Sequence, residues 1–418
     1  MDTRMLEPLA VPEVAPPERS LSPGRWVKEN LFSTWFNGVL TVLLAALLGW
    51  ALYKIGRFVF VDARWEIVEV NLTNILVFRF PRDELWRLWA GMFVLAAAFG
   101  VGAGVAARLK REEEGGGGPG TTSPLTTLRR LGPLIAVAGV FLWFAKSVEG
   151  TLLVLAIAAV WGVARFAGLQ IPPRRARWAG GGVLLAIVLA YVIVTSFGGV
   201  GWSEGWGGLL LTVFLAAAGI AISFPLGVLL ALGRRSSLPA VRIVCITYIE
   251  LVRGVPLITL LFLGAFMLGF FLPPGSDTPS LETRALVALV LFTAAYVAEI
   301  VRGGLQAVPR DQTEAAQALG LSPLKTTRLI VLPQALRAVI PALVGQFISL
   351  FKDTSLVFII GLTELLAVSE LITKQPEFLA EGLIIETLVF AGFVYWGGSY
   401  WMSRESQRLE RRLGVGER

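Results

Sequence analysis

The sequence contains no histidine and a single cysteine among its 418 residues. The lack of histidine removes the commonest general base and the commonest metal ligand, which excludes most zinc, haem and catalytic-triad chemistry. Cys245 lies inside an apolar run, and one cysteine cannot form a disulfide within the chain. The phosphate-binding pattern G-x-x-x-x-G-K-[ST] is absent as well. We therefore expect a chain that is not an enzyme, binds no metal or cofactor, and does not hydrolyse ATP itself.

Charged residues are scarce, at 16% of the chain, whereas hydrophobic residues make up 55% and the mean hydropathy is +0.70. Soluble domains carry about a quarter charged residues, so this composition indicates a protein of the lipid bilayer. The net charge of +7 would also suit a nucleic-acid-binding protein. In a chain this apolar, an excess of Lys and Arg in cytoplasmic loops explains the charge better, and we expect no nucleic-acid partner.

Apolar runs recur along the chain, and most are long enough to cross a hydrocarbon core of roughly 30 Å, which takes about 20 residues. They cover residues 34–60, 85–107, 131–147, 150–169, 178–197, 207–232, 239–272, 284–303, 335–361 and 383–402. The sequence thus predicts an all-α polytopic membrane protein with about ten transmembrane helices. The first run is long and lacks a clear cleavage site, so we expect it to be a retained span rather than a signal peptide.

Basic residues are distributed unevenly among the loops between these runs. With a cytoplasmic N-terminus and one crossing per run, the cytoplasmic segments are 108–130, 165–177, 233–242, 302–337 and the tail after residue 404. All of them are rich in Arg or Lys, which predicts that both termini are cytoplasmic. Lys54, Arg57 and Arg64 fall at the outer end of the first span, where they would have to snorkel.

Composition also divides the chain into parts. Residues 1–33 are polar and proline-rich and are expected to form a mobile cytoplasmic tail. Residues 34–204 would be an accessory region of about five spans, with a flexible Gly-rich linker near 112–120. Residues 205–412 would be a transport core that contains the long cytoplasmic loop 302–337.

Three glycines within the second run, Gly100, Gly102 and Gly104, resemble part of a nucleotide-binding loop. Because they lie inside a predicted span, we interpret them instead as small residues that let neighbouring helices approach closely.

The long cytoplasmic loop carries helix-capping signals. Asp311 could cap a short helix, with Glu314 reaching back as in a capping box. Gly320 suits the left-handed position that closes such a helix. Ser322 would cap a second helix that has Pro323 at its first position. The loop is therefore expected to fold as a short helix-turn-helix.

The first of these two helices would present a small, smooth apolar face formed by Ala315, Ala316, Ala318 and Leu319. Such a face suits a shallow groove on another protein. An amphipathic helix lying on the membrane surface is the alternative, and the residues alone leave both open.

At this loop the sequence resembles the permeases of ABC importers. Glu314-Ala315-Ala316, Gly320, Ile330, Leu332 and Pro333 match the family signature E-A-A-x3-G-x9-I-x-L-P at every spacing. The resemblance implies that the loop forms a coupling helix, which sits in a cleft of a cytoplasmic ATP-binding subunit. The residues that it assigns to ATPase coupling are Asp311, Glu314, Ala315, Ala316, Leu319 and Gly320.

Other runs are similar to the polar amino acid uptake branch of that family. They are Tyr248–Leu257 (YIELVRGVPL), Ala294–Gly304 (AAYVAEIVRGG) and Phe351–Leu356 (FKDTSL). The resemblance covers about residues 205–412 and implies the type I importer permease core. The extra N-terminal spans are similar in length to those of general L-amino acid permease subunits.

The resemblance also implies partners and a location. The expected partners are a cytoplasmic ATP-binding subunit that uses ATP, a second permease that is identical or related, and an extracytoplasmic amino-acid-binding protein. The expected location is a bacterial inner membrane.

Ionisable residues within spans are candidates for function because burial in lipid is costly. Glu250 and Arg253 lie three residues apart just before Gly254 and Pro256, which should break the span. They could form a self-neutralising ion pair. Alternatively, they could line the substrate path, with Arg253 meeting a carboxylate and Glu250 an ammonium group.

Two further charged pairs are ambiguous in the same way. Glu299 and Arg302 are expected at the inner end of their span. There they would snorkel to the membrane–water interface or contact the coupling loop, rather than bind substrate. Lys352 and Asp353 interrupt the run 335–361 and would form either a gate on the substrate path or a local pair.

Functions of other classes remain to be weighed. An ion-gradient-driven secondary amino acid transporter would also be polytopic, but it usually shows paired repeats and needs no coupling helix. A membrane enzyme would need a convergent catalytic set, which the sequence lacks. A sensor or assembly subunit that kept the fold without transporting is not excluded by sequence.

Overall fold

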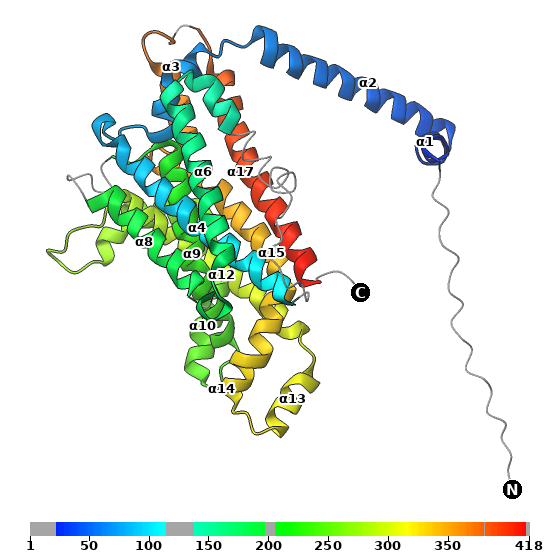
Figure 1. Cartoon of the computed structure of the whole chain (residues 1–418), viewed down its shortest axis with the longest axis vertical. Helices are drawn as coiled ribbons and strands as arrows, with labels where there is room; N and C mark the ends of the chain where they lie inside the picture. The colour runs from blue at the N-terminus through cyan, green and yellow to red at the C-terminus, as the bar shows by residue number, and fades with distance from the viewer. Residues whose placement is uncertain (1–21, 114–137, 177, 197–204, 380, 415–418) are drawn as a thin grey trace. The chain divides into compact units, whose positions relative to one another are not determined.

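The computed structural model describes residues 22–113, 138–176, 178–196, 205–379 and 381–414. Contacts divide the chain into two compact units, Met1–Arg64 and Trp65–Arg418. The described residues are helical or lie in turns and loops, apart from a single bridge between Gly208 and Glu364 (Figure 1). The all-α class is confirmed.

The first unit contains α1 (Pro23–Leu31), α2 (Trp35–Arg57) and the π-helical turn η1 (Phe58–Asp62). The segment α2–η1 is long and apolar enough to cross a membrane and has no buried residue. Arg57 Nε lies 3.1 Å from Asp62 Oδ2, so one of the three basic residues expected to snorkel has a carboxylate beside it. Helix α1 lies in the segment expected to be a mobile tail, where Pro23 suits the first helical turn.

The second unit holds the other described elements. In chain order they are α3 (Glu66–Val77), η2 (Arg82–Glu84), α4 (Leu85–Glu113), α6 (Val148–Gln170), α7 (Pro173–Ala176), α8 (Ala179–Ser196), α9 (Gly208–Arg234), α10 (Pro239–Gly254), α11 (Leu257–Phe262), η3 (Leu263–Met267), η4 (Leu268–Phe271), α12 (Leu281–Ala307), α13 (Arg310–Ala318), α14 (Pro323–Thr326), η5 (Thr327–Val331), α15 (Leu332–Asp353), η6 (Thr354–Ile360), α16 (Leu365–Leu371), η7 (Ile372–Lys374) and α17 (Ile384–Leu413).

Seven segments in the described part of the chain are long and apolar enough to span a membrane. An eighth span arises if the pair Pro239–Gly254 and Leu257–Phe271, bent by 107°, crosses as one. The predicted break at Gly254 and Pro256 is therefore present. The count of ten is not confirmed, because α17 does not pass the same test and the run 131–147 is described only from residue 138.

The glycines of α4 face other helices. A Cβ on Gly100 would lie 2.9 Å from Ala164 Cβ of α6, and a Cβ on Gly104 would lie 2.8 Å from Gly168 Cα of the same helix. Gly102 faces Val183 of α8. The predicted packing role is thus confirmed for Gly100 and Gly104, where only hydrogen fits between the two backbones, whereas Gly102 meets only a side-chain methyl group at 3.4 Å.

The same contacts show that α4 and α6 run in the same direction, because higher numbers in α4 meet higher numbers in α6. The predicted span 131–147 is described only from residue 138 and stays a prediction.

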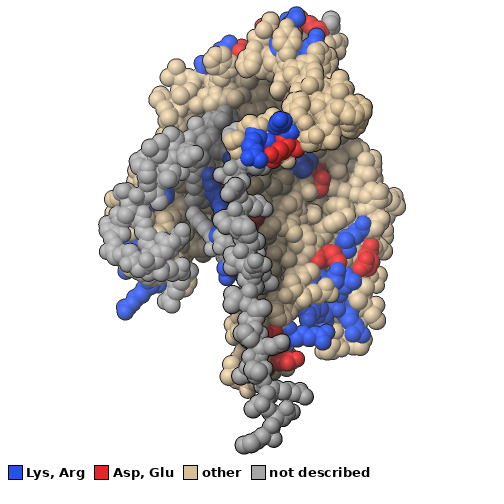
Figure 2. All heavy atoms as spheres, turned by 90° about the vertical axis from the view of Figure 1, so that its right-hand side faces the viewer, with Lys and Arg blue, Asp and Glu red and all other residues tan. Residues whose placement is uncertain are grey.

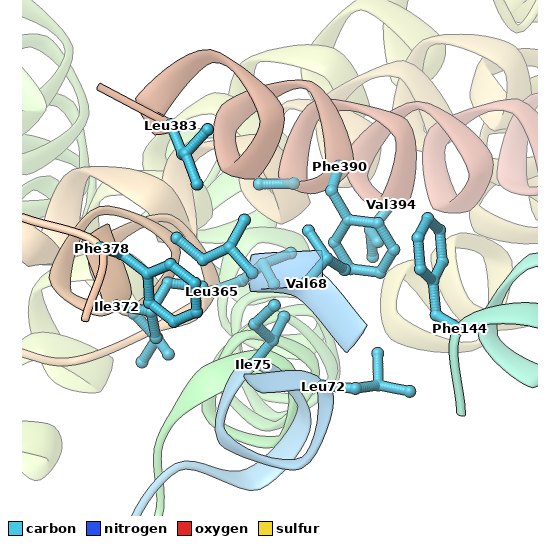
Figure 3. Packing of buried hydrophobic residues seen from close by; sticks show 13 residues of the cluster. Val68, Leu72, Ile75, Phe144, Leu365, Ile372, Phe378, Leu383, Phe390 and Val394 are labelled. Carbon is cyan, nitrogen blue, oxygen red and sulfur yellow. The ribbon is translucent and has the colours of Figure 1, made fainter. Parts of the chain in front are cut away.

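Helix α3, which the sequence analysis did not predict as an element, lies in the hydrophobic core. Its residues Val68, Leu72 and Ile75 pack with Leu365 of α16 and Phe390 of α17, and Figure 3 shows them converging with Phe144 and Val394. Part of the predicted accessory region thus shares one core with residues after 205. The division at 204–205 stays a prediction, and the linker 112–120 lies largely outside the described residues.

Candidate functional site

The predicted coupling loop connects α12 to α15 and contains α13 and α14. Val308 is extended before Pro309, as is usual for a residue that precedes proline. Pro309 occupies the N-cap of α13, so Asp311 lies within the first turn and makes no capping hydrogen bond. The predicted capping box of Asp311 and Glu314 is therefore wrong, because the helix begins one residue before Asp311. A carboxylate in the first turn still favours the helix dipole.

The end of α13 follows the prediction. Gly320 has φ +79°, in the left-handed region. The N–H of Gly320 donates to Gln317 O at 2.9 Å and the N–H of Leu321 to Ala316 O at 3.1 Å, which is the Schellman arrangement. Ser322 Oγ then accepts from the N–H of Lys325 at the start of α14. Consecutive caps fix the angle between the two short helices.

The apolar face of α13 is partly buried within the chain and partly exposed. Ala316 is buried against the chain's own loop, whereas Ala315 and Ala318 are exposed and Leu319 is 84% exposed. Glu314 is also exposed. The loop is thus a fixed projection whose outward surface is small and apolar, and Ala316 anchors that surface instead of belonging to it.

The charged residues of α9, α10 and α12 form one network around Glu299. The Glu299 carboxylate pairs with Arg302 on its own helix, with Arg234 at 3.3 Å and with Arg253 at 3.6 Å. Arg234 Nη1 also lies 3.0 Å from Glu250 Oε1. Three arginines therefore share two glutamates, and the network keeps an excess of one positive charge.

This network changes the interpretation of Glu250 and Arg253. The two residues do not neutralise each other, because Glu250 pairs with α9 and Arg253 with α12. Arg253 also lies over the Tyr296 ring at 5.5 Å, and its buried Nε makes no hydrogen bond within the described residues. The Glu250 side chain is 56% exposed, against 22% for Glu299. Arg234 was missed from the sequence because it looked like an ordinary residue of a basic loop.

Lys352 and Asp353 lie where α15 ends and the 3-10 helix η6 begins. The helix type changes at this pair, but the candidate span Pro323–Ile360 continues through it, so the predicted interruption amounts to no more than this change. Lys352 is exposed and Asp353 is partly buried, and no ion pair between them is present in the described residues.

Sequence analysis also missed a buried carboxylate close to this point. Glu364 is fully buried and caps α16, accepting from the N–H groups of Leu366 and Ala367 at 2.8 Å. Tyr395 Oη of α17 donates to Glu364 Oε2 at 2.8 Å. Burial raises the pKa of the Glu364 carboxyl, and these hydrogen bonds oppose the rise. Nothing in the sequence singles out Glu364, because Glu370, Glu377 and Glu381 lie between the same two apolar runs.

Most of the molecular surface outside these groups is uncharged. Figure 2 shows Lys, Arg, Asp and Glu gathered in separate groups, with broad uncharged surface between them. Large apolar side chains such as Leu229, Val244 and Ile243 are exposed along the helices. This pattern is typical of a protein whose helices meet lipid.

Comparison with known proteins identifies relatives over nearly the whole chain. The family described as "Binding-protein-dependent transport system inner membrane component" matches residues 223–414. The inner membrane amino-acid ABC transporter permease protein YhdY of Escherichia coli is 36% identical, over 94% of this chain and 93% of that protein. The glutamate/glutamine/aspartate/asparagine transport system permease protein BztC of Rhodobacter capsulatus is 35% identical, over 93% of each. The general L-amino acid transport system permease protein AapQ of Rhizobium johnstonii is 42% identical over 41% of this chain and 44% of its own length.

Proposed function

This chain belongs to the family of amino-acid ABC transporter permeases, and from that membership we propose that it is the permease subunit of an ATP-driven amino acid importer. It forms the translocation path, while a separate cytoplasmic subunit hydrolyses ATP. Relatives with this role match both halves of the chain. An ion-gradient-driven transporter loses its support, because the relatives that span the chain are ABC permeases.

The observation that carries the proposal is the fixed projection of α13. Ala315 and Leu319 are exposed on a helix that is capped at its end by Gly320 and braced beneath by Ala316. A rigid helix transmits a displacement to the spans that flank it, whereas a flexible loop would absorb it. Asp311, Glu314, Ala315, Leu319 and Gly320 would form or shape the surface that meets the ATPase subunit. The signature residues Glu314, Ala315 and Gly320 support this role.

The network around Glu299 supports a place for Glu250 and Arg253 on the substrate path. An amino acid carries a carboxylate and an ammonium group. The network offers an excess positive charge, an unpartnered Nε on Arg253 and an exposed carboxylate on Glu250. Lys352 and Asp353, at the change of helix type, would act as a gate further along the path.

The remaining assignments follow from the family. A soluble binding protein delivers the amino acid; the family description, which names a binding-protein-dependent transport system, supports this role. A second permease, identical or related, completes the path. Both termini and α13 face the cytoplasm of a bacterial cell, in the inner membrane.

Reconstitution tests this proposal. The chain is co-expressed with its neighbouring gene products, purified, and placed in liposomes with labelled amino acids and the binding protein outside. Uptake should require ATP within reach of the ATPase subunit and should persist without an ion gradient. Uptake driven by a proton or sodium gradient without ATP would replace this function by secondary transport.

A further inference from the structure

A hollow of about 390 Å³ lies between the end of α3 and the segment that follows α16. Its walls are Asn74, Phe78 and Arg79 on one side and Leu371, Lys374 and Gln375 on the other. Helices α3 and α13 stand at opposite ends of the second unit in Figure 1. The inference therefore rests on the proposed function, which places α13 in the cytoplasm and this hollow on the outer side.

The hollow is held in shape by an amide chain. Asn71 of α3 exchanges two hydrogen bonds with Gln375, and Asn74 Nδ2 donates to Asn71 Oδ1 at 3.0 Å. Arg82 Nη2 donates to Asn74 Oδ1 at 2.5 Å and to Phe78 O at 3.3 Å. The side-chain oxygens of this chain are thus occupied from within the protein, which leaves cationic groups to face a ligand.

The rim of the hollow is positively charged. Arg79 is exposed and lies over the Phe78 ring at 5.3 Å, and Arg82 is exposed beside it. Neither arginine has a carboxylate partner in the part of the chain that the structure describes. Lys374, across the hollow, is paired with Glu370 at 2.8 Å. Two uncompensated guanidinium groups beside an apolar floor fit a carboxylate carried on an apolar support.

The exposure of the hollow to solvent indicates what kind of ligand carries that carboxylate. Sites for small molecules bury most of the ligand's surface, whereas this hollow opens to solvent and has its cations at the edge. An acidic side chain that projects from a large partner fits such a site. The partner that reaches the outer side of an importer is its soluble binding protein.

We propose that the hollow between α3 and η7 is a docking site for an acidic projection of the extracytoplasmic binding protein, with Arg79 and Arg82 as its charged contacts. Helix α3, which lies outside the matched family region 223–414, thereby contributes to recognition of the binding protein. Charges at the rim of an interface act mainly on association and its salt dependence.

The test measures ATP hydrolysis by the reconstituted importer as a function of binding-protein concentration. Arg79→Glu is the principal variant, because Arg79 makes no hydrogen bond within the described residues and its replacement therefore breaks none. The double variant Arg79→Glu with Arg82→Glu reverses both charges and should enlarge the effect. Arg242→Glu, at an exposed arginine in the first turn of α10, is the matched control. The binding-protein concentration that gives half-maximal stimulation should rise several-fold in the Arg79 variant and further in the double variant. Its dependence on salt should weaken, while the maximal rate stays unchanged.

Arg79→Lys should stay close to the unchanged protein, since it keeps the charge. An unchanged half-maximal concentration in the double variant would overturn the docking site while leaving the importer function intact. A lower maximal rate at an unchanged half-maximal concentration would also overturn it. Loss of ATP-driven uptake in the unsubstituted protein would instead contradict the proposed function itself.

Discussion

Asn71 of α3 and Gln375, just after η7, exchange two side-chain amide hydrogen bonds, with Nδ2–Oε1 at 3.2 Å and Nε2–Oδ1 at 2.9 Å. The residues are 304 positions apart in the sequence, and Asn71 is buried. The pair joins a helix of the N-terminal part to the segment after α16. Two segments far apart in the sequence therefore meet in one polar contact beside the hydrophobic cluster of Figure 3.

Replacing Asn71 with alanine should destabilise the protein. The change leaves the Gln375 amide without its partner, and a buried polar group left unsatisfied costs about 1–3 kcal/mol. Thermal unfolding of the purified complex measures the loss. Thr73→Ala, at an exposed position of the same helix, is the control and should unfold at the temperature of the unsubstituted protein. Equal unfolding temperatures for both variants would show that the contact does not hold α3 in place.

The close approach of α4 and α6 predicts a different response at two glycines. Gly104→Leu should lower the unfolding temperature markedly, because a side chain there meets the α6 backbone at Gly168 and forces the helices apart. Gly162→Leu adds the same side chain to α6 where no atom lies within 4 Å, so its effect should be small. A tolerated Gly104→Leu would mean that the helices are not packed in this way.

The network around Glu299 predicts that replacing Glu299 lowers the yield of folded complex more than replacing Glu250 does. Glu299→Gln leaves Arg253 and Arg302 without their carboxylate, so the yield of folded complex should fall, since uncompensated charge in the membrane is costly. Glu250→Gln should be milder, because Glu250 is more exposed and its ion pair in the described residues is with Arg234 alone.

Size-exclusion profiles of the tagged complexes compare these variants. Adding Arg253→Gln to Glu299→Gln removes one unpaired charge and should recover part of the folded yield. No recovery in the double variant would show that Arg253 and Glu299 are not coupled.

The short capping signals of the coupling loop could be predicted from sequence because they are local. Gly320, Ser322 and Pro323 act within three residues of their own positions, and the structure places each as expected. The predicted capping box is wrong because the helix begins at Arg310, with Pro309 at the N-cap, so Asp311 lies inside the first turn. That choice depends on the path of the chain after α12, which residue patterns do not report.

Contacts between distant segments could not be predicted in this way. Helix α3 is short, and its apolar residues follow no clear pattern that predicts a buried helix. Its position follows from packing against α16 and α17. Glu250 and Arg253 looked like a pair because they share a helix face, yet each meets a different helix. Glu364 acquires its role from Tyr395, which lies on α17.

The buried Glu364 carboxyl predicts a dependence of stability on pH. Its pKa is raised in the folded protein by burial, so the folded chain keeps the proton to a higher pH than the unfolded chain does. The stability that this group contributes is greatest in acid. It falls as the pH rises from the ordinary carboxyl value, about 4, to the raised folded value.

Glutamine at position 364 does not titrate in this range. The decrease in stability with rising pH should therefore be absent from the unfolding temperatures of Glu364→Gln, measured between about pH 4 and about pH 7. The difference between the two proteins should therefore change with pH in that window. Parallel curves would show that Glu364 does not titrate differently on folding.

In the proposed function α13 couples this chain to an ATPase, and one pair of variants tests this role. Ala315→Arg places a bulky charge on the exposed face of α13, whereas Gln317→Arg places the same charge at an exposed position elsewhere on that helix. Amino-acid-stimulated ATP hydrolysis of the reconstituted importer is measured for both. We expect Ala315→Arg to lose stimulation while it inserts into the membrane normally, and Gln317→Arg to keep most of the stimulation. Normal stimulation and uptake by Ala315→Arg would contradict the assignment of α13 as the coupling helix.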